Sequence, residues 1–570
     1  MRRPLEKGPI RRNHVLRLRY RDPPGPKGVL RYTTSSDLDL PPAFSLTMAS
    51  SVTLLFLLAA IGFTAGHNIL AIFPHHGQSH FMTVKPYLKE LARRGDNLTV
   101  IGFYPLKPHE RMKNYHDISL DGCLEMHNNN VSFSLFEGPV TYISRTLHNT
   151  IALYLMSGEV TSSIFRVPAL KEFIHRVLND GHNFDLVIVE TFQMDVFLGL
   201  IHRMNVPFIS VTTCNLFAWS SERIGQPQNP SYVPTNQDIY STKMTLVERV
   251  KNTMSLLFTQ FAFHYLFVPK DQKIANEQFG PGLPPLPEIA KNTSLILANI
   301  HFSLNLPRPV VPQLIEVGGL HIQPAKPLTK DLQQFLNSST NGVIYFCMGS
   351  MLRGETFPLE KRQAFLAAFS KLPYNVLWKY EGDTLPGQPS NVKILSWTPQ
   401  RDILSHPNVK LFINHGGLLG TIEAVYEGVP MLGIPMFGDQ HINMNAIQSL
   451  GAGLVLDYKT LSQHTILNGI RTVLKPEYKM NAKRLQAQYR DRPTTAMETA
   501  IYWTDYVLRH KGAPHLRTAA VHMPWYQLLC LDILFIMLVA FITLVFIMKL
   551  ALSLLLRQIF HSKATKNKTD

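Results

Sequence analysis

Residues 412–423 have the types and the spacing of a phosphate-binding turn. An apolar run ends at Asn414, His415 follows it, and the residues beyond suit a helix. The turn contains Gly416, Gly417 and Gly420. Backbone N–H groups and the positive end of a helix bind a diphosphate in such a turn, and glycines let the backbone approach it closely. His415 can donate a hydrogen bond to a phosphate oxygen, and Glu423, one turn into the helix, can accept hydrogen bonds from two ribose hydroxyls.

Two further segments carry side chains that suit a base and a sugar. Trp397 lies eighteen residues before His415, in a Trp-Thr-Pro-Gln sequence that ends at Gln400, and offers a flat face to a stacked base. Asp439 and Gln440 close the next apolar run, and their side chains can read the hydroxyl groups of a sugar. A glycine turn alone is often only structural, and the side chains that accompany this one support a binding site there.

The run 412–440 resembles the signature of the UDP-glycosyltransferase family, the inverting transferases that include glucuronosyl- and glucosyltransferases. Residues 397–400 are similar to the uracil-binding element of that family. The resemblance covers roughly residues 67–560, and Asn414 and Glu190 are most similar to the insect, membrane-anchored members. It implies that a UDP-sugar is the co-substrate and that Ser350 makes a further phosphate contact.

An inverting sugar transfer needs a base, which takes the proton of the acceptor hydroxyl as its oxygen attacks the anomeric carbon. His75, His76 and His80 all follow the first apolar run. On the residues alone, each of these histidines is a candidate. The family pattern of serine, histidine and an aromatic residue matches residues 79–81, so the resemblance assigns the base to His80.

A carboxylate is expected to hold the base in one tautomer and to stabilise its imidazolium form. The family position for this group falls on Glu190, at the end of an apolar run, and Asp195, five residues later, is the alternative. No metal ion or other cofactor is expected, because the helix end, His415 and Ser350 would meet the charge of the diphosphate.

The apolar runs that lead into these residues have the length of buried strands. Runs 68–73 and 98–103 flank a segment, 80–94, with apolar residues at helical spacing, so these three predict a strand–helix–strand unit with parallel strands. Further strands are expected at 184–189 and 206–211. The middle region, 215–330, is rich in proline and aromatic residues, and we expect the least regular structure there.

A second set of short apolar runs opens near Gly342, and helical segments separate several of them. This alternation predicts a second doubly wound domain, in which ligands bind at the carboxyl ends of the strands. The expected strands are 343–347, 375–379, 392–397, 409–414, 430–434 and 453–456. The predicted fold class is therefore α/β, with two facing Rossmann-like, doubly wound domains of the GT-B type and one C-terminal transmembrane helix.

The domain boundaries follow from these patterns. We expect an N-terminal acceptor-binding domain at 67–325 and a C-terminal UDP-sugar-binding domain at 326–490, with a proline-marked linker at 324–327. Residues 491–525 are expected to form a helical return segment and a lumenal juxtamembrane region.

Two apolar segments predict the topology. Residues 48–66 contain about a dozen apolar residues followed by small ones, which is typical of a signal peptide. Residues 526–548 are long enough to span a bilayer, and the basic residues of 549–570 predict a cytoplasmic tail. Lysines third and fifth from the end resemble a retrieval signal of the endoplasmic reticulum. Four sequons favour a glycoprotein with its bulk in the lumen: Asn97, Asn130, Asn292 and Asn337.

Composition excludes other function classes. The formal charge is +16, but residues 1–47 hold ten basic residues against four acidic ones, and the remaining charge forms no basic stripe, which argues against a nucleic-acid partner. These first residues are interpreted as a basic disordered extension, or else translation starts at Met48.

Four cysteines make neither a disulfide scaffold nor a zinc site. The sequence leaves one Cys123–Cys214 bridge open but gives it no positive support.

We therefore expect a membrane-bound enzyme of detoxification that moves a hexose from a UDP-sugar to a hydroxyl of a small lipophilic acceptor. The resemblance to insect members favours glucose. The alternatives are a UDP-glucuronosyltransferase and a catalytically silent lumenal protein that binds a sugar nucleotide. The sequence leaves a homo-oligomer open.

Overall fold

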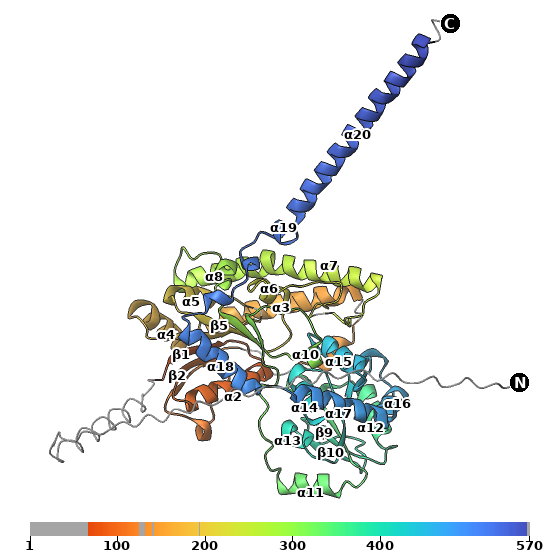
Figure 1. The fold of residues 1–570 in the computed structure, drawn as a ribbon. Helices are drawn as coiled ribbons and strands as arrows, with labels where there is room; N and C mark the ends of the chain where they lie inside the picture. Colours follow the sequence, from red (N-terminus) through yellow and green to blue (C-terminus); the bar gives the residue numbers. More distant parts are fainter. Residues whose placement is uncertain (1–65, 125–130, 139–141, 193, 237, 567–570) are drawn as a thin grey trace, which may run out of the picture. The chain divides into compact units, whose positions relative to one another are not determined.

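The computed structural model describes residues 66–124, 131–138, 142–192, 194–236 and 238–566 (Figure 1). The predicted extension 1–47 and all but the last residue of the predicted signal peptide lie outside the described residues, as do Asn130 and Lys568. The described part contains two α/β domains, each built on one parallel sheet, and a C-terminal helix.

The first domain contains a seven-stranded sheet in the order β3-β2-β1-β4-β5-β6-β7. Its strands are β1 (Asn68–Phe73), β2 (Asn97–Gly102), β3 (Tyr115–Ser119), β4 (Leu186–Glu190), β5 (Phe208–Thr212), β6 (Leu295–Ala298) and β7 (Leu314–Glu316). The predicted strands β1, β2, β4 and β5 are confirmed, because central strands are buried on both faces and leave an apolar run in the sequence. The sequence patterns do not predict β3, which has exposed polar residues at the sheet edge, or the very short β6 and β7.

Helices cover both faces of this sheet. Alternate residues of β1 belong to two separate cores, Leu70 and Ile72 to one and Ile69 and Ala71 to the other. The helices are α2 (Gln78–Arg93), α3 (Tyr142–Ile164), α4 (Pro168–Asn179), α5 (Leu198–Met204), α6 (Ala218–Glu222), α7 (Leu246–Ala262), α8 (Val268–Phe279), α9 (Leu286–Ala290) and α10 (Phe302–Asn305).

The region 215–330 is more regular than the sequence predicts. Helices α7 and α8 run through it and are joined by a π-helical turn at Phe263–Phe267. A capping box between Thr245 and Glu248 begins α7. Apolar residues recur at helical spacing along α7, but they lie on its exposed face, where a surface helix normally carries polar ones.

The second domain contains a six-stranded sheet in the order β10-β9-β8-β11-β12-β13. Its strands are β8 (Val343–Cys347), β9 (Asn375–Lys379), β10 (Val392–Leu395), β11 (Val409–Asn414), β12 (Met431–Gly433) and β13 (Gly453–Val455), and its helices include α11 (Lys330–Ser338), α12 (Leu359–Phe369), α13 (Gln400–Leu404), α14 (Leu418–Glu427), α15 (Gln440–Ser449) and α16 (Gln463–Val473). All six predicted strands are confirmed, because each is a short apolar run in this buried sheet.

Both sheets reverse their strand order at a corresponding place. In the first sheet β1 and β4 are neighbours, and in the second β8 and β11 are neighbours. Loops that leave such a pair turn to opposite sides, and the crevice between them at the carboxyl ends is where ligands bind in these folds. The predicted site residues follow or end these strands: His80, Glu190, Ser350 and His415.

Residues 131–138 cross from the first domain to the second, which the sequence does not predict. Phe133 is fully buried in the core of the second domain, and its ring stacks on Phe357 with 3.7 Å between centroids. The backbone N–H of Val131 donates to the carbonyl of Met351 at 3.0 Å. This short arm therefore joins the two domains through core packing.

The chain returns to the first domain near its end. After α17 (Pro476–Arg490), α18 (Ala496–Arg509) packs against α2, and the hydroxyls of Thr504 and Tyr87 lie 2.5 Å apart. Two short 3₁₀ turns lead on to α19 (Trp525–Leu528) and α20 (Leu531–Lys566). The part Leu531–Phe560 is long and apolar enough to cross a membrane, and none of it is buried in the protein.

The four cysteines are free thiols. Cys214 and Cys347 are buried, Cys123 is half-buried and Cys530 is exposed. The structure therefore contains no bridge between Cys123 and Cys214. Burial raises the pKa of the Cys214 thiol well above its ordinary value, which keeps it in the unreactive protonated form.

Candidate active site

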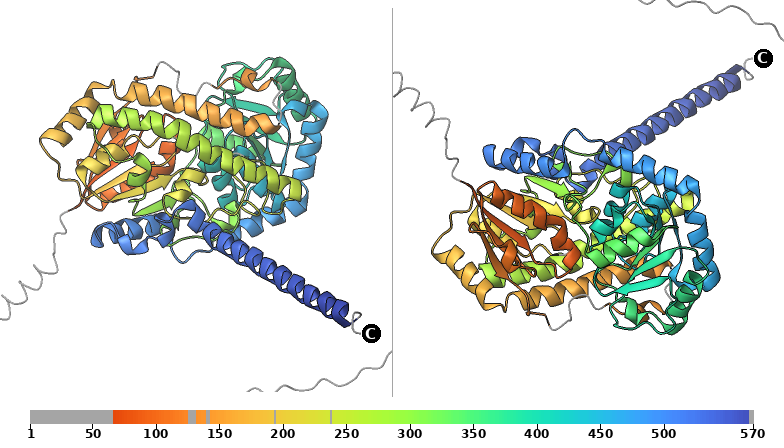
Figure 2. Two further views of the ribbon diagram at one scale, coloured as in Figure 1. Left: turned by 90° about the horizontal axis from the view of Figure 1, so that it is seen from above. Right: turned by 90° about the horizontal axis from the view of Figure 1, so that it is seen from below.

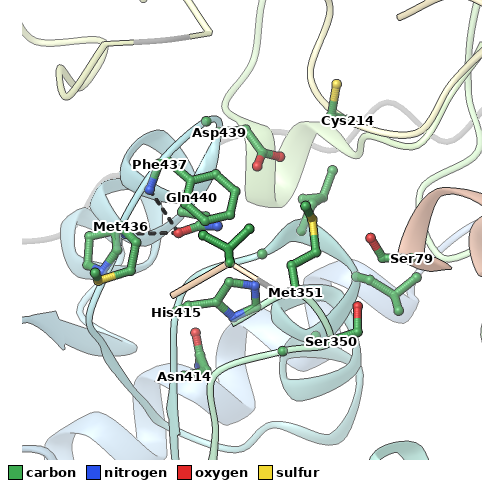
Figure 3. Close-up of a pocket in the computed structure, with 18 of the residues that line it drawn as sticks. Ser79, Cys214, Ser350, Met351, Asn414, His415, Met436, Phe437, Asp439 and Gln440 are labelled. Carbon is green, nitrogen blue, oxygen red and sulfur yellow. Dashed lines mark hydrogen bonds between the residues drawn. The ribbon is translucent and has the colours of Figure 1, made fainter. Parts of the chain in front are cut away.

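A cavity of about 910 Å³ opens between the two domains, and residues of both line it. Figure 3 shows part of it, with Ser79 and Cys214 of the first domain on one side and His415 and Asp439 of the second on the other. All the residues predicted for the donor site line this cavity: Ser350, Trp397, Gln400, His415, Gly417, Gly420, Glu423, Asp439 and Gln440. His80 lines it from the first domain. The tertiary structure thus gathers the residues predicted to bind the donor and the predicted base at one cavity.

His80 is held by two neighbouring strands. It lies in the first turn of α2, and its Nδ1 donates to Oε1 of Glu190, the last residue of β4, at 2.6 Å. The hydroxyl of Thr213, directly after β5, lies 2.8 Å from the same nitrogen and donates to the same carboxylate oxygen at 3.1 Å. Because Nδ1 keeps its proton toward the carboxylate, Nε2 is the nitrogen that can accept one.

Glu190 and Asp195 have different partners. The carboxylate of Asp195 accepts from the guanidinium of Arg223 at 2.9 and 3.1 Å, and both side chains are buried. The backbone N–H of Asp195 donates to Asp271. Of the two carboxylates that the sequence leaves open, Glu190 therefore contacts the imidazole, and Asp195 belongs to a buried ion pair.

The other two histidines stack beside the base. The ring of His75 lies parallel to that of His80 with 3.9 Å between centroids, and His76 stacks on His75 at 5.0 Å. Nδ1 of His75 accepts from the backbone N–H of Gly77 at 2.8 Å. Burial, followed by the charges of the neighbouring histidines, lowers the pKa of His75 well below its ordinary value and lowers that of His76 less. Both rings are therefore neutral near pH 7.

The turn after β11 is built around the imidazole of His415. A Cβ atom at Gly349 would lie 2.5 Å from Cε1 of this ring, and one at Gly417 would lie 2.6 Å from its Nε2, so both positions need glycine. Gly416 has a φ of +83°, which also favours glycine. Burial and the charge of Lys379 lower the pKa of His415 to about 4, so the ring is neutral. Its buried Nδ1 has no hydrogen-bond partner among the described residues, which suits a ligand at this turn.

Glu423 lies deep in the same part of the cavity. Its Oε2 accepts from Nε2 of Gln400 at 2.6 Å, and burial raises its pKa to about 7. A Cβ atom at Gly420 would lie 2.9 Å from that amide nitrogen, so the glycine leaves room for the contact. Trp397 is 56% exposed, and the ammonium of Lys379 lies 5.8 Å from its ring. One ring face is therefore accessible for stacking.

Asp439 and Gln440 begin α15 at the far wall of the cavity. Oε1 of Gln440 accepts from the backbone N–H groups of Met436 at 2.8 Å and Phe437 at 3.1 Å, which directs the amide as drawn in Figure 3. Oδ2 of Asp439 accepts from Asn443 at 3.0 Å. Burial raises the pKa of Asp439, and it is close enough to His80 for the two charges to interact.

A family model for UDP-glucuronosyl and UDP-glucosyl transferases matches residues 68–566 of this chain. The chain belongs to this family. It is similar to UDP-glycosyltransferase UGT5 of Dactylopius coccus, with 42% identity over 90% of this chain and 95% of the relative. It is also similar to human UDP-glucuronosyltransferase 2B15, with 31% identity over 82% and 90% of the two chains. The resemblance of residues 412–440 to the signature of this family is therefore confirmed.

The solved structures support the fold of this UDP-glycosyltransferase. A UDP-glucosyltransferase from Polygonum tinctorium has a TM-score of 0.51 and 16% identity, and the match covers 78% of this chain and 99% of that one. At this identity the match shows the fold alone, which is the GT-B arrangement of two parallel-sheet domains that the sequence predicts. The chain is therefore a UDP-glycosyltransferase in both sequence family and fold.

Three polar residues of this UDP-glycosyltransferase site are absent from the sequence prediction. Thr213 supports the contact between His80 and Glu190, and Asn443 supports Asp439. Asn215 donates to Asn443 at 3.3 Å and so joins the two domains beside the cavity. The sequence holds only weak signals for these three residues. Thr213 and Asn215 follow the apolar run of β5, and Asn443 lies one helical turn after Asp439.

Proposed function

We propose that this UDP-glycosyltransferase transfers glucose from UDP-glucose to a hydroxyl group of small lipophilic acceptors, with His80 as the general base. The observation that carries the proposal is the contact of His80 with Glu190 at a cavity whose opposite wall is the glycine turn of the second domain. A base held by a carboxylate and a phosphate-binding turn are the two components that an inverting transfer from a nucleotide sugar requires.

In the proposed step, Nε2 of His80 takes the proton of the acceptor hydroxyl while the acceptor oxygen forms a bond to the anomeric carbon. The bond from that carbon to the phosphate oxygen breaks, and UDP leaves with the bonding electrons. Attack from the face opposite the leaving group inverts the anomeric centre. Glu190 stabilises the imidazolium that forms, because its oxygen already accepts from Nδ1.

The second domain is proposed to bind UDP through separate contacts to each part of the nucleotide. The N-terminal end of α14, the neutral His415 and Ser350 would meet the diphosphate. Glu423 would accept from the ribose hydroxyls, and Trp397 would stack on uracil. We propose that no metal ion takes part, since these groups and the helix end supply the donors for the diphosphate.

The identity of both substrates rests on the cavity and on the relatives. Asp439 and Gln440 are proposed to read hydroxyl groups of the hexose. UDP-glucosyltransferase 2 of Dactylopius coccus is 37% identical over 88% of this chain, which favours glucose, and the human relative named a glucuronosyltransferase makes glucuronate the second candidate. Apolar side chains of the first domain form part of the cavity wall, which favours a lipophilic acceptor: Met82, Leu153, Met156, Phe192 and Phe217.

We further propose that α20 anchors the chain in the membrane of the endoplasmic reticulum, with both domains in the lumen. The apolar length of α20 supports a single span, and Lys549 and Arg557 in its second half favour a cytoplasmic C-terminus. Three sequon asparagines are exposed, as glycosylation requires: Asn97, Asn292 and Asn337.

To test the proposal, microsomes that contain the full chain are incubated with labelled UDP-glucose, UDP-galactose or UDP-glucuronate and with phenols or steroids as acceptors. The rate of sugar transfer to each acceptor is measured. We expect the highest transfer from UDP-glucose, and no loss of transfer with a metal chelator. Faster transfer from UDP-glucuronate would favour the second candidate. UDP-sugar binding without transfer to any acceptor would favour the catalytically silent protein.

A further inference from the structure

Helix α7 has an inverted distribution of apolar and polar side chains. Its buried residues are Asn252, Thr259 and Ala262, and Asn252 donates inward to the carbonyls of Pro230 and Val233. Its outer face, continued into the π-helical turn, carries a stripe of apolar side chains that are 55–68% exposed: Val247, Val250, Met254, Leu257, Phe261 and Tyr265. Soluble helices place their apolar face inward, so a stripe of this length facing outward indicates a surface that binds something apolar.

Helix α3 extends this surface. It packs against α7, and the hydroxyls of Thr146 and Ser255 lie 3.3 Å apart where the two helices meet. One further row of exposed apolar residues, four positions apart, lies on α3: Leu147, Ile151 and Leu155, of which Leu155 also lines the cavity. We call the exposed apolar residues of the two helices the α3–α7 surface.

The α3–α7 surface lies next to the start of the apolar C-terminal helix. Gly225, just after α6, packs against Thr518 and Val521, and α6 in turn packs against α7. Four residues after the buried Val521, Trp525 begins α19 with 68% of its surface exposed. Figure 1 shows α7 along the side of the domain from which α20 leaves, and the view from above in Figure 2 has α3 and α7 in front.

Charges beside the stripe suit the headgroup region of a bilayer. Lys243 and Arg249 are exposed next to the start of α7, where a long cationic side chain can reach phosphate groups while the apolar stripe faces the acyl chains. Trp525 and Tyr526 add exposed aromatic rings of the kind that gather at the boundary of a membrane.

We propose that the α3–α7 surface rests on the lipid surface of the membrane that α20 crosses. The inference depends on the membrane anchoring proposed above. Because the span starts beside this surface, it holds the surface close to the bilayer, and contact with lipid becomes an intramolecular event at high effective concentration. A second copy of the chain has no such advantage, which favours lipid as the partner. The apolar face of such a helix lies about 5–10 Å into the boundary between headgroups and acyl chains.

The test uses the full chain in phosphatidylcholine vesicles, with Cys123→Ser and Cys530→Ser to remove the accessible thiols. A nitroxide label is attached to an added cysteine, in either Met254→Cys or Phe261→Cys. Frequent collisions of the label with oxygen indicate that it lies in lipid, and frequent collisions with a water-soluble nickel chelate indicate that it lies in water. Met480→Cys on α17, where Met480 is 66% exposed, is the matched control, and Ile542→Cys in α20 reports the anchor. The four labelled positions are exposed, so the added cysteines leave the core intact.

We expect a several-fold higher ratio of oxygen to nickel collisions at 254 and 261 than at 480. A ratio like that of 480 at both positions, with a lipid signal at 542, would overturn the proposal and leave the anchor standing. Water signals at 254, 261 and 542 would overturn both. Spin–spin broadening at 254 without a rise in oxygen collisions would identify a second copy as the partner and also overturn the proposal.

Discussion

Nδ1 of His80 and Oε1 of Glu190 are 2.6 Å apart, although 110 residues separate them in the sequence. His80 lies in the first turn of the helix after β1, Glu190 ends β4, and these two strands are neighbours in the sheet. The strand reversal at this point of the fold therefore brings the imidazole and the carboxylate together at the cavity.

Replacing His80 by alanine should slow turnover by about 10²–10⁴-fold, the usual contribution of a general base. UDP binding should stay nearly unchanged, because the donor turn lies in the other domain. Steady-state kinetics and calorimetric titration with UDP measure the two effects. His116→Ala, at an exposed position on the edge strand β3, is the matched control, and full activity of His80→Ala would refute the assignment.

Glu190→Gln should lower kcat less than His80→Ala does, because Glu190 acts through the imidazole. Asp195→Asn should leave kcat nearly unchanged and lower the free energy of unfolding by about 3 kcal/mol, since it weakens a buried ion pair with Arg223. Kinetics and chemical denaturation of both variants separate the roles. A larger loss of kcat at Asp195 than at Glu190, in protein that remains folded, would transfer the role to Asp195.

Glu423 should make UDP binding depend on pH. Burial raises its pKa from 4.5 to about 7, so between these values the folded protein keeps a proton that the unfolded chain has lost. The contribution of Glu423 to the free energy of unfolding therefore falls as the pH rises through this window. Ribose hydroxyls donate to the ionised carboxylate, so UDP affinity should rise by about tenfold from about pH 6 to pH 8.

Titrations across this range measure the effect, and Glu423→Gln should abolish the dependence. Glu423→Ala should weaken UDP binding at about pH 8 by about 1–3 kcal/mol, the scale of charge-assisted hydrogen bonds. Trp397→Ala should also weaken it through lost stacking. Unchanged UDP affinity in both alanine variants would mean that the nucleotide binds elsewhere.

Gly417→Ala should raise the KM for the UDP-sugar with a much smaller change in the free energy of unfolding. The added Cβ would lie 2.6 Å from Nε2 of His415 and would displace the ring, although the backbone φ of −59° suits alanine. Gly138→Ala, where a Cβ meets nothing within 4 Å, is the control. Equal KM values in the two variants would contradict a role for the imidazole in donor binding.

Phe133→Ala should destabilise the protein by about 3–5 kcal/mol, because it empties a fully buried aromatic position in the core of the second domain. Phe302→Ala, at a position 53% exposed, should change the free energy of unfolding by less than about 0.5 kcal/mol. Denaturant titrations compare the variants. Similar small effects would show that the arm of residues 131–138 contributes little to joining the domains.

The sequence by itself determined the elements whose signal is local. Each strand of the second sheet is an apolar run because both faces of a parallel sheet are buried, and the donor turn is recognisable because glycine, histidine and glutamate must follow one strand at fixed spacing. The apolar length of α20 is likewise a property of one continuous segment.

Only the tertiary structure decided the contacts between distant segments. It assigned Glu190 to His80 and Asp195 to Arg223, and it brought Phe133 into the other domain. It also showed α7 with its apolar face outward in a region that the sequence predicts to be irregular. The physical reason is that periodicity and propensity report the neighbourhood of one segment, whereas the partner of a side chain depends on how sheets and helices pack in space.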